Sequence, residues 1–550
     1  MRRLDRVERA VLVVTLLALL ARLVGLGARP FHWDEARVGY WTLRSLETGV
    51  YEYRPVAGGP FLYVVARRLF AFGLTSDAAA RLPVALIGGL LPAAALLFRR
   101  DDRPDLEAGL SNLETAALAL LLAFAPPLLY YSRVLRGDLP LAAFSLLAVG
   151  LVWRGLRRND RRTLYAGAAA FGLALTTSGF VLAVLGCWLL AVLLTFDEAR
   201  VRNEPPATIR ERVRGGVDLV TDRWVPLLRA VTVSIVVAVA FYLPRGRIEL
   251  SEPSTLLAAL ETGTVGALQR FLSVRVLGRH APPTYTNDHP LLPFVADTAG
   301  VLVAVALPVV ALALWGFFRE RYAGRSRPVV NFAAYWAGAG LLLFPVATEV
   351  NQPWVAVHVL APATIPAAVG LAALWNHAAR SVAAADAARL AAALLLLSGA
   401  GVHTGAVAAG EVYDTPEARD SLPGYAQPGA EYRVAVTAIE TGVDGNEGAD
   451  VLYVGAALAV DDESVLDRPP IPERAQGAFS ARLPLSWYVE RADTQTASVT
   501  GANAMPGELP PVIVTTPEQR RAVADRLSGY ERYTVEQGLT NRRLVVFVES

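Results

Sequence analysis

Cysteine and lysine are almost missing from this chain of 550 residues. The single cysteine, Cys187, lies inside an apolar run, which excludes a disulfide framework or a cluster of thiolate metal ligands. There is no lysine, so every basic side chain is an arginine, which fits a GC-rich genome. Walker A, GxGxxG, HExxH and nucleophile-elbow patterns are also missing, and we expect no nucleic-acid partner. Any chemistry is therefore expected from carboxylates and arginines.

Apolar residues, in contrast, are abundant. They make up 54% of the sequence, and the mean hydropathy is +0.38, which exceeds the values of ordinary soluble domains. Runs such as "AVLVVTLLALLARLVGLG" approach the length of about 20 residues that crosses a bilayer. The predicted fold class is therefore a polytopic α-helical membrane protein. The first run follows "MRRLDRVER" without a cleavage-site pattern, so we expect it to remain as a helix.

The apolar runs predict about eleven spanning helices within residues 1–409. Arginine-rich loops such as "MRRLDRVER", "RGLRRNDRR" and "FFRERYAGRSRP" alternate with arginine-poorer loops. The positive-inside rule assigns the arginine-rich loops to the cytoplasm. A cytoplasmic N-terminus in the cell membrane and an extracytoplasmic region 410–550 follow. The expected spans are 9–27, 78–98, 113–130, 139–157, 163–178, 180–196, 225–243, 293–317, 329–347, 355–374 and 386–409.

Residues 410–550 differ in composition from the membrane part. They hold 12 arginines and 22 acidic residues, whereas residues 1–409 hold 40 and 28. An acidic domain without lysine is typical of a surface exposed to salt, as in a halophile. The runs "VLYVGAALAV", "PPVIVTT" and "RRLVVFV" predict strands. "TPEQRRAVADRLSGY" predicts a helix with Thr516 as N-cap and Pro517 at its first position. Together they predict a small extracytoplasmic α/β domain.

The first outer loop, residues 28–77, is too long for a simple connection. "DEARVGYWTLRSLETG" and "GPFLYVVARRLFAFG" have helical spacing but are too short to span, so we expect two helices in the membrane interface. Asp34 and Glu35 open the first of them, between His32 and Arg37. These acids either complement the helix dipole, or they supply a general base and a ligand for Mg²⁺ or Mn²⁺. The residues alone leave both interpretations open.

A second polar stretch is "YYSRVLRGDLPLAAF", at the predicted outer ends of two spans. Arg133, Arg136 and Asp138 lie there at the edge of the hydrocarbon, where charged residues need partners or water. Arginine forks suit a phosphate, and the carboxylate suits a metal bridging that phosphate, although Asp138 also fits an ordinary helix start. In later outer segments a solvated loop or a satisfied buried histidine is the commoner outcome. The secondary candidates there are His289, Glu349 and His358.

Four stretches share the order and spacing of the N-terminal half of the GT-C membrane glycosyltransferases. They are "WDEARVGYWTLRSL", "GPFLYVVARRLFAFG", "ARLPVALIGGLLPAAALLF" and "YYSRVLRGDLPLAAFSLLAVG". The chain resembles the dolichyl-phosphate-mannose protein mannosyltransferase and aminoarabinose transferase branch. With "TEVNQPWVAVHVLAP" and "LPLSWYVER", it is most similar to the archaeal flippase activity-associated proteins of surface glycosylation. The likeness covers residues 30–150 and is weaker over 345–362 and 484–491.

The resemblance implies a GT-C enzyme that moves a sugar from a polyprenyl (dolichyl)-phosphate carrier to a glycan or protein acceptor. The reaction would occur on the outer face of the membrane, in surface glycosylation of the S-layer type. It also implies a catalytic Asp-Glu pair at Asp34 and Glu35, and an acidic partner at Asp138. An arginine that contacts the lipid phosphate in the aminoarabinose branch falls on Arg37.

Chemical reasoning adds residues to this site. Cations must stabilise the charge that develops on a leaving phosphate, so Arg133 and Arg136 are expected to join Arg37 as donor-phosphate ligands. Asp34 would act as the general base on an acceptor hydroxyl, and Asp34 with Asp138 would hold a divalent cation if one is used.

The alternative hypothesis is a protein of the same pathway that binds the lipid carrier without chemistry or assists its translocation. Partner proteins would then include a flippase or other glycosylation proteins. One position departs from the pattern of the family. Relatives commonly carry a histidine before the Gly-Pro pair of the second interfacial helix, and this chain has Gly58 there.

Overall fold

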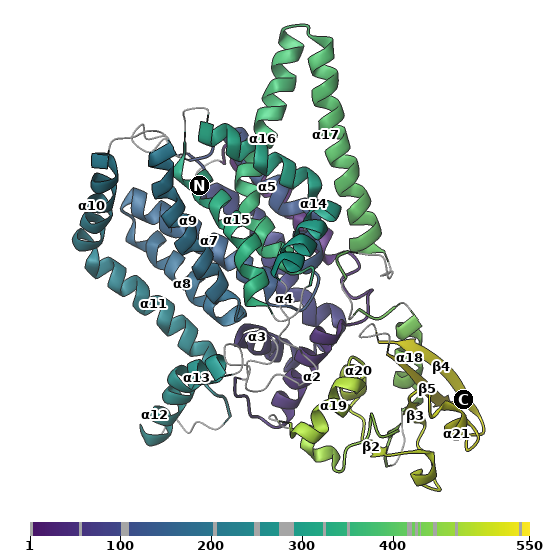
Figure 1. Ribbon diagram of the computed structural model, residues 1–550. Coiled ribbons are helices and arrows are strands. Elements are labelled where there is room, and N and C mark those ends of the chain that lie inside the picture. The colour runs from purple at the N-terminus through teal and green to yellow at the C-terminus, as the bar shows by residue number, and fades with distance from the viewer. Residues whose placement is uncertain are drawn as a thin grey trace.

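The structure is a computed structural model, and it has two parts (Figure 1). A large helical bundle contains most of the chain, and a smaller domain with a β-sheet lies at one end of it. The N-terminus and α10 (Pro206–Asp222) lie toward the other end. The described residues are 4–53, 58–100, 109–201, 206–246, 253–273, 291–322, 326–348, 352–414, 421–423, 427–429, 431–443, 448–467, 471–537 and 542–550.

Helices occupy every range predicted to span the membrane. Within the described part of the chain, seven segments are long and apolar enough to cross a bilayer. The count of eleven spans is not confirmed, because α5 and α8 are short and α1 contains four charged residues. The helices are α1 (Arg6–Leu23), α4 (Asp77–Leu90) with η1 (Leu91–Leu97), α5 (Asn112–Phe124), α6 (Pro126–Tyr131), α7 (Asp138–Arg158), α8 (Arg161–Thr177), α9 (Val181–Val201), α11 (Trp224–Tyr242), α14 (Leu291–Tyr322), α15 (Pro328–Ala347), α16 (Val355–Ala383) and α17 (Ala387–Val407).

Both short helices predicted in the first outer loop are present, as α2 (Trp33–Glu47) and α3 (Pro60–Phe70). They lie between the bundle and the C-terminal domain (Figure 1). Helix α2 packs closely on α20 (Leu485–Arg491), because a Cβ at Gly39 would lie only 2.6 Å from the ring of Trp487. Glycine at this position therefore lets the two helices meet. Two further short helices, α12 (Pro253–Glu261) and α13 (Ala267–Phe271), follow α11.

The C-terminal domain is built around a mixed sheet of five strands in the order β2-β1-β3-β5-β4. Strand β1 pairs in parallel with β2 and β3, while β5 pairs antiparallel with β3 and β4. The predicted strands appear as β1, β3 and β5, so the predicted α/β character is confirmed. The elements are α18 (Glu431–Gly442), β1 (Val451–Val454), α19 (Glu473–Arg482), α20, β2 (Thr496–Val499), β3 (Val512–Thr515), α21 (Arg520–Ala524), β4 (Tyr530–Glu536) and β5 (Arg543–Glu549).

The predicted start of helix α21 is wrong. The helix begins at Arg520 with Gln519 as its N-cap, and not at Pro517 after Thr516. The backbone N–H of Gln519 donates to the carbonyl of Thr516, so the residues between them form a separate turn. A threonine followed by a proline fits such a turn as well as a helix start, so the pattern does not distinguish the two.

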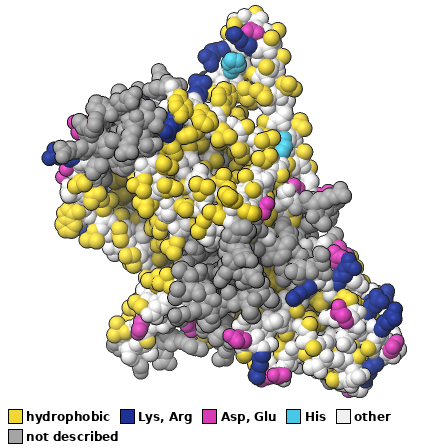
Figure 2. Space-filling model, in the orientation of Figure 1, with side chains coloured by type: hydrophobic (Ala, Val, Ile, Leu, Met, Phe, Trp, Pro, Cys, Tyr) yellow, Lys and Arg dark blue, Asp and Glu magenta, His cyan; other side chains and the backbone are white. Residues whose placement is uncertain are grey.

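The surface of the two parts differs in the way expected of a multi-pass membrane protein. Figure 2 shows hydrophobic side chains over much of the helical bundle, whereas charged side chains gather on the C-terminal domain and at the far end of the bundle. Exposed apolar residues are frequent on α1, α9, α11, α14 and α17. In water such patches would be unfavourable, but in a bilayer they face lipid.

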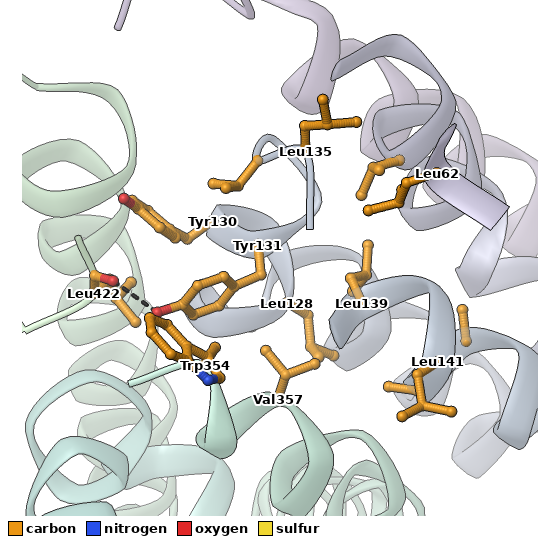
Figure 3. Packing of buried hydrophobic residues seen from close by; sticks show 14 of the residues in the cluster. Leu62, Leu128, Tyr130, Tyr131, Leu135, Leu139, Leu141, Trp354, Val357 and Leu422 are labelled. Atoms are coloured by element: carbon orange, nitrogen blue, oxygen red, sulfur yellow. Dashed lines mark hydrogen bonds between the residues drawn. The ribbon is translucent and has the colours of Figure 1, made fainter. Parts of the chain in front are cut away.

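A buried apolar cluster packs around residues 128–141, the segment that contains Arg136 and Asp138 (Figure 3). Leu128 and Tyr131 of α6 lie beside Leu139 of α7, and Trp354 and Val357 approach from the start of α16. The hydroxyl of Tyr131 donates to the carbonyl of Leu422, 2.8 Å away. The cluster thus holds together segments that are distant in sequence, next to the charged residues Arg136 and Asp138.

Candidate functional site

The first turn of α2 is fixed by a histidine. His32 is the N-cap, and its Nδ1 accepts the backbone N–H of Asp34 at 3.1 Å. In return Glu35 accepts the backbone N–H of His32 at 2.9 Å, which completes a capping box. Burial lowers the pKa of His32 to about 4, so this ring is neutral and can accept at Nδ1. His32 therefore sets the direction in which Asp34 leaves the helix.

Arg136 joins the two candidate acids. Its guanidinium pairs with the carboxylate of Asp34 and, through Nε, with Asp138 Oδ2 at 2.9 Å. The carbon of this guanidinium also lies 3.7 Å from the ring centroid of Trp354, a cation–π contact. Asp34 and Asp138, which are about a hundred residues apart in sequence, thus share one cation.

His358 lies on the far side of Asp138. Its Nε2 is 3.2 Å from Asp138 Oδ1, and its ring stacks on Phe344 at 4.3 Å with an angle of 7°. Asp138 therefore has a partner on each oxygen and is only 4% exposed, whereas the side chain of Asp34 is 27% exposed. Of Asp34, Arg136, Asp138 and His358, Asp34 has the most exposed side chain.

The cluster keeps Asp34 ionised. Burial by itself would raise the pKa of Asp34, but Arg136, His32 and Arg37 together hold that pKa below its ordinary value. The pKa of Arg136 is raised despite burial, because Asp138 and Asp34 both favour its charged form. At neutral pH the site therefore contains an ionised carboxylate paired with a permanent cation.

Glu35 points the other way and is fully enclosed. Arg81 of α4 donates to it twice, at 2.8 and 2.6 Å, and the backbone N–H of Leu135 donates at 2.6 Å. With the bond from His32, each oxygen of Glu35 accepts two donors, and the side chain has no exposed surface. This arrangement links α2, α4 and the segment before α7, and it supports a positioning role.

The two remaining arginines differ in their surroundings. Arg133 donates to four carbonyls at the end of α1, those of residues 21, 22, 24 and 25, so it caps that helix. Arg37 follows Asp34 by nearly one turn of α2, with its guanidinium carbon 5.4 Å from the ring centroid of Trp33. Arg37 is half-buried. Of these two arginines, Arg37 has the better access to a ligand beside Asp34.

The position of Arg136 also decides whether Asp34 and Asp138 can share a divalent cation, as expected from the sequence. Arg136 occupies the space between the two carboxylates that a shared ion would need. Among the residues that the structure describes, no group of three or more His, Cys, Asp and Glu side chains could hold a metal ion. As arranged, the donor set fits a guanidinium and does not fit a metal. Two secondary candidates, His289 and Glu349, lie outside the described residues.

Sequence reasoning missed two residues that organise this region. Arg81, buried partner of Glu35, lies inside a predicted span, where an ionisable residue is costly unless paired; that cost could have drawn attention to it. Asp77 begins α4 and accepts from Trp487 Nε1, Tyr488, Arg491 and Arg433 at 2.9–3.1 Å. No sequence pattern indicates this second set of contacts, because the partners are more than 350 residues away.

Comparison with known proteins places the fold. Residues 432–549 match the family described as the Agl23 flippase-associated protein C-terminal domain. The crystal structure of ArnT from Cupriavidus metallidurans bound to undecaprenyl phosphate is similar, with a TM-score of 0.56 and 18% identity; the match covers 98% of this chain and 97% of that one. The apo form of ArnT gives a TM-score of 0.57 at 17% identity, with the same coverage. No curated protein matches the sequence.

A weaker match is the archaeal oligosaccharyltransferase AglB from Archaeoglobus fulgidus, in complex with an inhibitory peptide and a dolichol-phosphate. Its TM-score is 0.49 at 16% identity, and the match covers 98% of this chain and 74% of that one. The chain thus has the GT-C fold seen in ArnT, and its residues 432–549 match the family of the Agl23 flippase-associated C-terminal domain. The resemblance seen in the sequence is confirmed.

Proposed function

We propose that this protein transfers a sugar from a polyprenyl-phosphate carrier to a glycan or protein acceptor on the outer face of the cell membrane. One observation carries the proposal. In a fold shared with ArnT, which is described as bound to undecaprenyl phosphate, an ionised and partly exposed Asp34 lies against Arg136 and one turn from Arg37. A base and two cations are the groups that this reaction requires.

The proposed reaction is a displacement at the anomeric carbon of the donor sugar. The acceptor hydroxyl forms the new bond to this carbon, and its proton moves to the carboxylate of Asp34. The bond between the anomeric carbon and the phosphate oxygen breaks, and the electron pair remains on the polyprenyl phosphate. Arg136 and Arg37 stabilise this leaving group, while Asp138, His358 and Trp354 hold Arg136 in position. Glu35 supports the turn that carries Asp34.

A non-catalytic lipid-binding or translocation factor remains the second candidate function, because the family of the C-terminal domain is described as flippase-associated. Such a protein would also need cations for the lipid phosphate. It would not need Asp34 as a base. The two functions therefore make different demands on one side chain.

Reconstitution in liposomes with radiolabelled polyprenyl-phosphate hexoses, and a membrane extract of the source organism as acceptor, separates these functions. We expect the wild type to move label into the acceptor, and Asp34→Asn to lower the rate about 100-fold or more. Asp34→Asn should still bind the labelled lipid. The control is Asp525→Asn at an exposed position of the C-terminal domain, which should transfer label at the wild-type rate.

Two results would overturn the proposal. The first is a wild-type protein that never labels an acceptor yet moves the labelled lipid between leaflets, which would support the translocation factor. The second is an Asp34→Asn variant with full transfer. A parallel reaction with a chelator tests the divalent cation: because Arg136 fills the space between the acids, we expect transfer to continue without Mg²⁺ or Mn²⁺.

A further inference from the structure

A polar cavity lies between α2 and the C-terminal domain. Its volume is about 350 Å³, near the lower end of ordinary ligand pockets. Tyr40 and Arg44 of α2 form one wall. The opposite wall comes from the C-terminal domain, namely Tyr453, Glu463, Ser464, Leu466, Asp467, Arg482, Ser486, Val489, Glu490, Thr494, Gln495 and Thr496. The lining is rich in hydroxyl, amide, carboxylate and guanidinium groups, and it is too polar for a lipid chain.

One end of this cavity is fully paired. Arg482 donates to both oxygens of Glu463, at 2.7 and 2.9 Å, and to the carbonyl of Leu458 at 2.8 Å. Its guanidinium carbon also lies 4.0 Å from the ring centroid of Tyr453. Such a satisfied buried pair gives the cavity a rigid floor.

The other end is incompletely paired. Glu490 has a side chain that is only 7% exposed, and its Oε1 lies 2.8 Å from Nε of Arg44. These two atoms form an ion pair that is poorly aligned for a hydrogen bond, and neither atom makes a hydrogen bond with another residue that the structure describes. Burial, opposed by Arg44 and reinforced by Glu47 and Asp467, raises the pKa of Glu490 to about 8. Burial therefore makes the charge of this carboxyl group costly unless Arg44 or a ligand donor stabilises it.

The cavity lies on the same helix as Asp34, the proposed base of the transfer reaction. Asp34 and Tyr40 are six residues apart on the same helix, about 9 Å along its axis, and Arg44 lies about 15 Å from Asp34. The residues that line the cavity come from α2 and the C-terminal domain, and none comes from the helical bundle that would hold a prenyl chain. A molecule bound there would lie beside the C-terminal domain, about 9–15 Å along α2 from Asp34.

We propose that this cavity binds a sugar unit of the acceptor, so that the acceptor is a glycan rather than a bare polypeptide. Hydroxyl groups of a sugar both donate and accept, which suits a lining of carboxylates, arginines, hydroxyls and an amide. A sugar hydroxyl would donate to the buried oxygen of Glu490 and accept from the Nε of Arg44, which now face each other without the alignment of a hydrogen bond. The inference rests on the proposed transferase function, because it names the class of acceptor for that reaction.

Ligand binding by the full-length protein in detergent tests the inference directly. The probes are the methyl glycosides of glucose, mannose, galactose, N-acetylglucosamine and glucuronic acid, observed by saturation-transfer NMR. We expect at least one of them to bind with a Kd of about 1 mM or lower. Ser464→Trp fills the exposed mouth of the cavity and should weaken that binding about tenfold or more. Ser528→Trp places the same ring at an exposed site outside the cavity and should leave binding unchanged.

A second variant distinguishes this inference from the proposed function. Asp34→Asn should bind the glycoside as the wild type does, even though it no longer transfers sugar. The inference is overturned if none of the five glycosides binds, or if Ser464→Trp binds them as tightly as Ser528→Trp does. If glycosides bind in the expected manner but labelled lipid never yields product, the transferase proposal fails and the cavity remains a sugar site.

Discussion

Asp34 and Glu35 are neighbours in sequence, but the structure gives them opposite surroundings. One residue along a helix is a rotation of about 100°, so adjacent side chains leave in different directions. Asp34 is partly exposed beside Arg136, whereas Glu35 is enclosed with Arg81. An adjacent acid pair in a sequence therefore need not be a pair of catalytic acids. Here we propose that one acid does chemistry and the other holds the helix.

Replacing Glu35 with glutamine tests this division. The change leaves the buried guanidinium of Arg81 without its counter-charge, and breaking such a pair costs about 3–5 kcal/mol. We expect a clearly lower thermal unfolding midpoint in detergent. Glu536→Gln is the matched control, because it breaks an ion pair with Arg543 in which both side chains are more than half exposed, worth about 0–1 kcal/mol. A Glu35→Gln variant with wild-type stability and no transfer would instead make Glu35 a catalytic residue.

At the scale of single residues, the sequence could indicate which side chains matter but not how they pair. The cost of charge near hydrocarbon pointed to Arg133, Arg136 and Asp138 alike. The structure brings Arg136 and Asp138 into the cluster and uses Arg133 to cap α1. Which arginine caps a helix and which meets an acid depends on how α1, α2 and α7 pack. Composition and spacing contain no information on that packing.

At the scale of elements, the starts of α3 and α7 both pack against the C-terminal end of α8. The carbonyls of Thr176 and Thr177 lie against glycines that begin two other helices: a Cβ would lie 2.1 Å from Thr176 O at Gly59, and 2.2 Å from Thr177 O at Gly137. Gly59 precedes α3 and Gly137 precedes α7. Only glycine allows these helix starts to approach α8 so closely.

Gly137→Ala should therefore disturb the site by shifting the start of α7. The added methyl group would force α7 away from α8 and move Asp138, the next residue. We expect slower sugar transfer and a loss of about 1–3 kcal/mol in stability. The control is Gly399→Ala in the interior of α17, where the structure places no described atom within 4 Å; it should be neutral or stabilising by about 0.5–1 kcal/mol. Equal transfer rates and unfolding midpoints for the two variants would contradict this account.

Helix existence was predictable, because hydropathy and capping residues are local features. Helix length was less predictable, as α21 shows, because the turn that precedes it competes for the same residues. The packing of α2 against α20 was not predictable at all. It depends on a match between Gly39 and Trp487, two residues that are separated by most of the chain.

At the scale of the whole molecule, one carboxylate connects the two parts. Asp77 lies at the start of α4, is 2% exposed, and accepts from two rings and two arginines of the C-terminal domain. The domain is therefore attached to the bundle by specific polar contacts as well as by the connecting chain. Its fixed position is what closes the cavity beside Arg44.

Asp77→Ala should loosen this attachment. It leaves Arg491 and Arg433 without a shared acceptor, at a cost of about 2–5 kcal/mol. We expect trypsin to cleave the full-length protein faster between the bundle and the C-terminal domain, and a fragment near residues 410–550 to accumulate. Asp525→Ala, an exposed acid of the same domain, provides the comparison. Identical digestion of the two variants would show that Asp77 does not hold the domain.

The shared pairing of Arg136 has one further consequence, which concerns the order of events. Arg136 pairs with two acids, and one of them is the proposed base. A donor phosphate that binds Arg136 competes with these carboxylates for the guanidinium, and Asp34 is the more exposed of the two. Binding of the donor would thus free Asp34 from Arg136. If an acceptor or a water molecule entered first, Asp34 would still be paired with Arg136. The pairing of Arg136 with Asp34 therefore favours an order in which the donor binds before the acceptor is deprotonated.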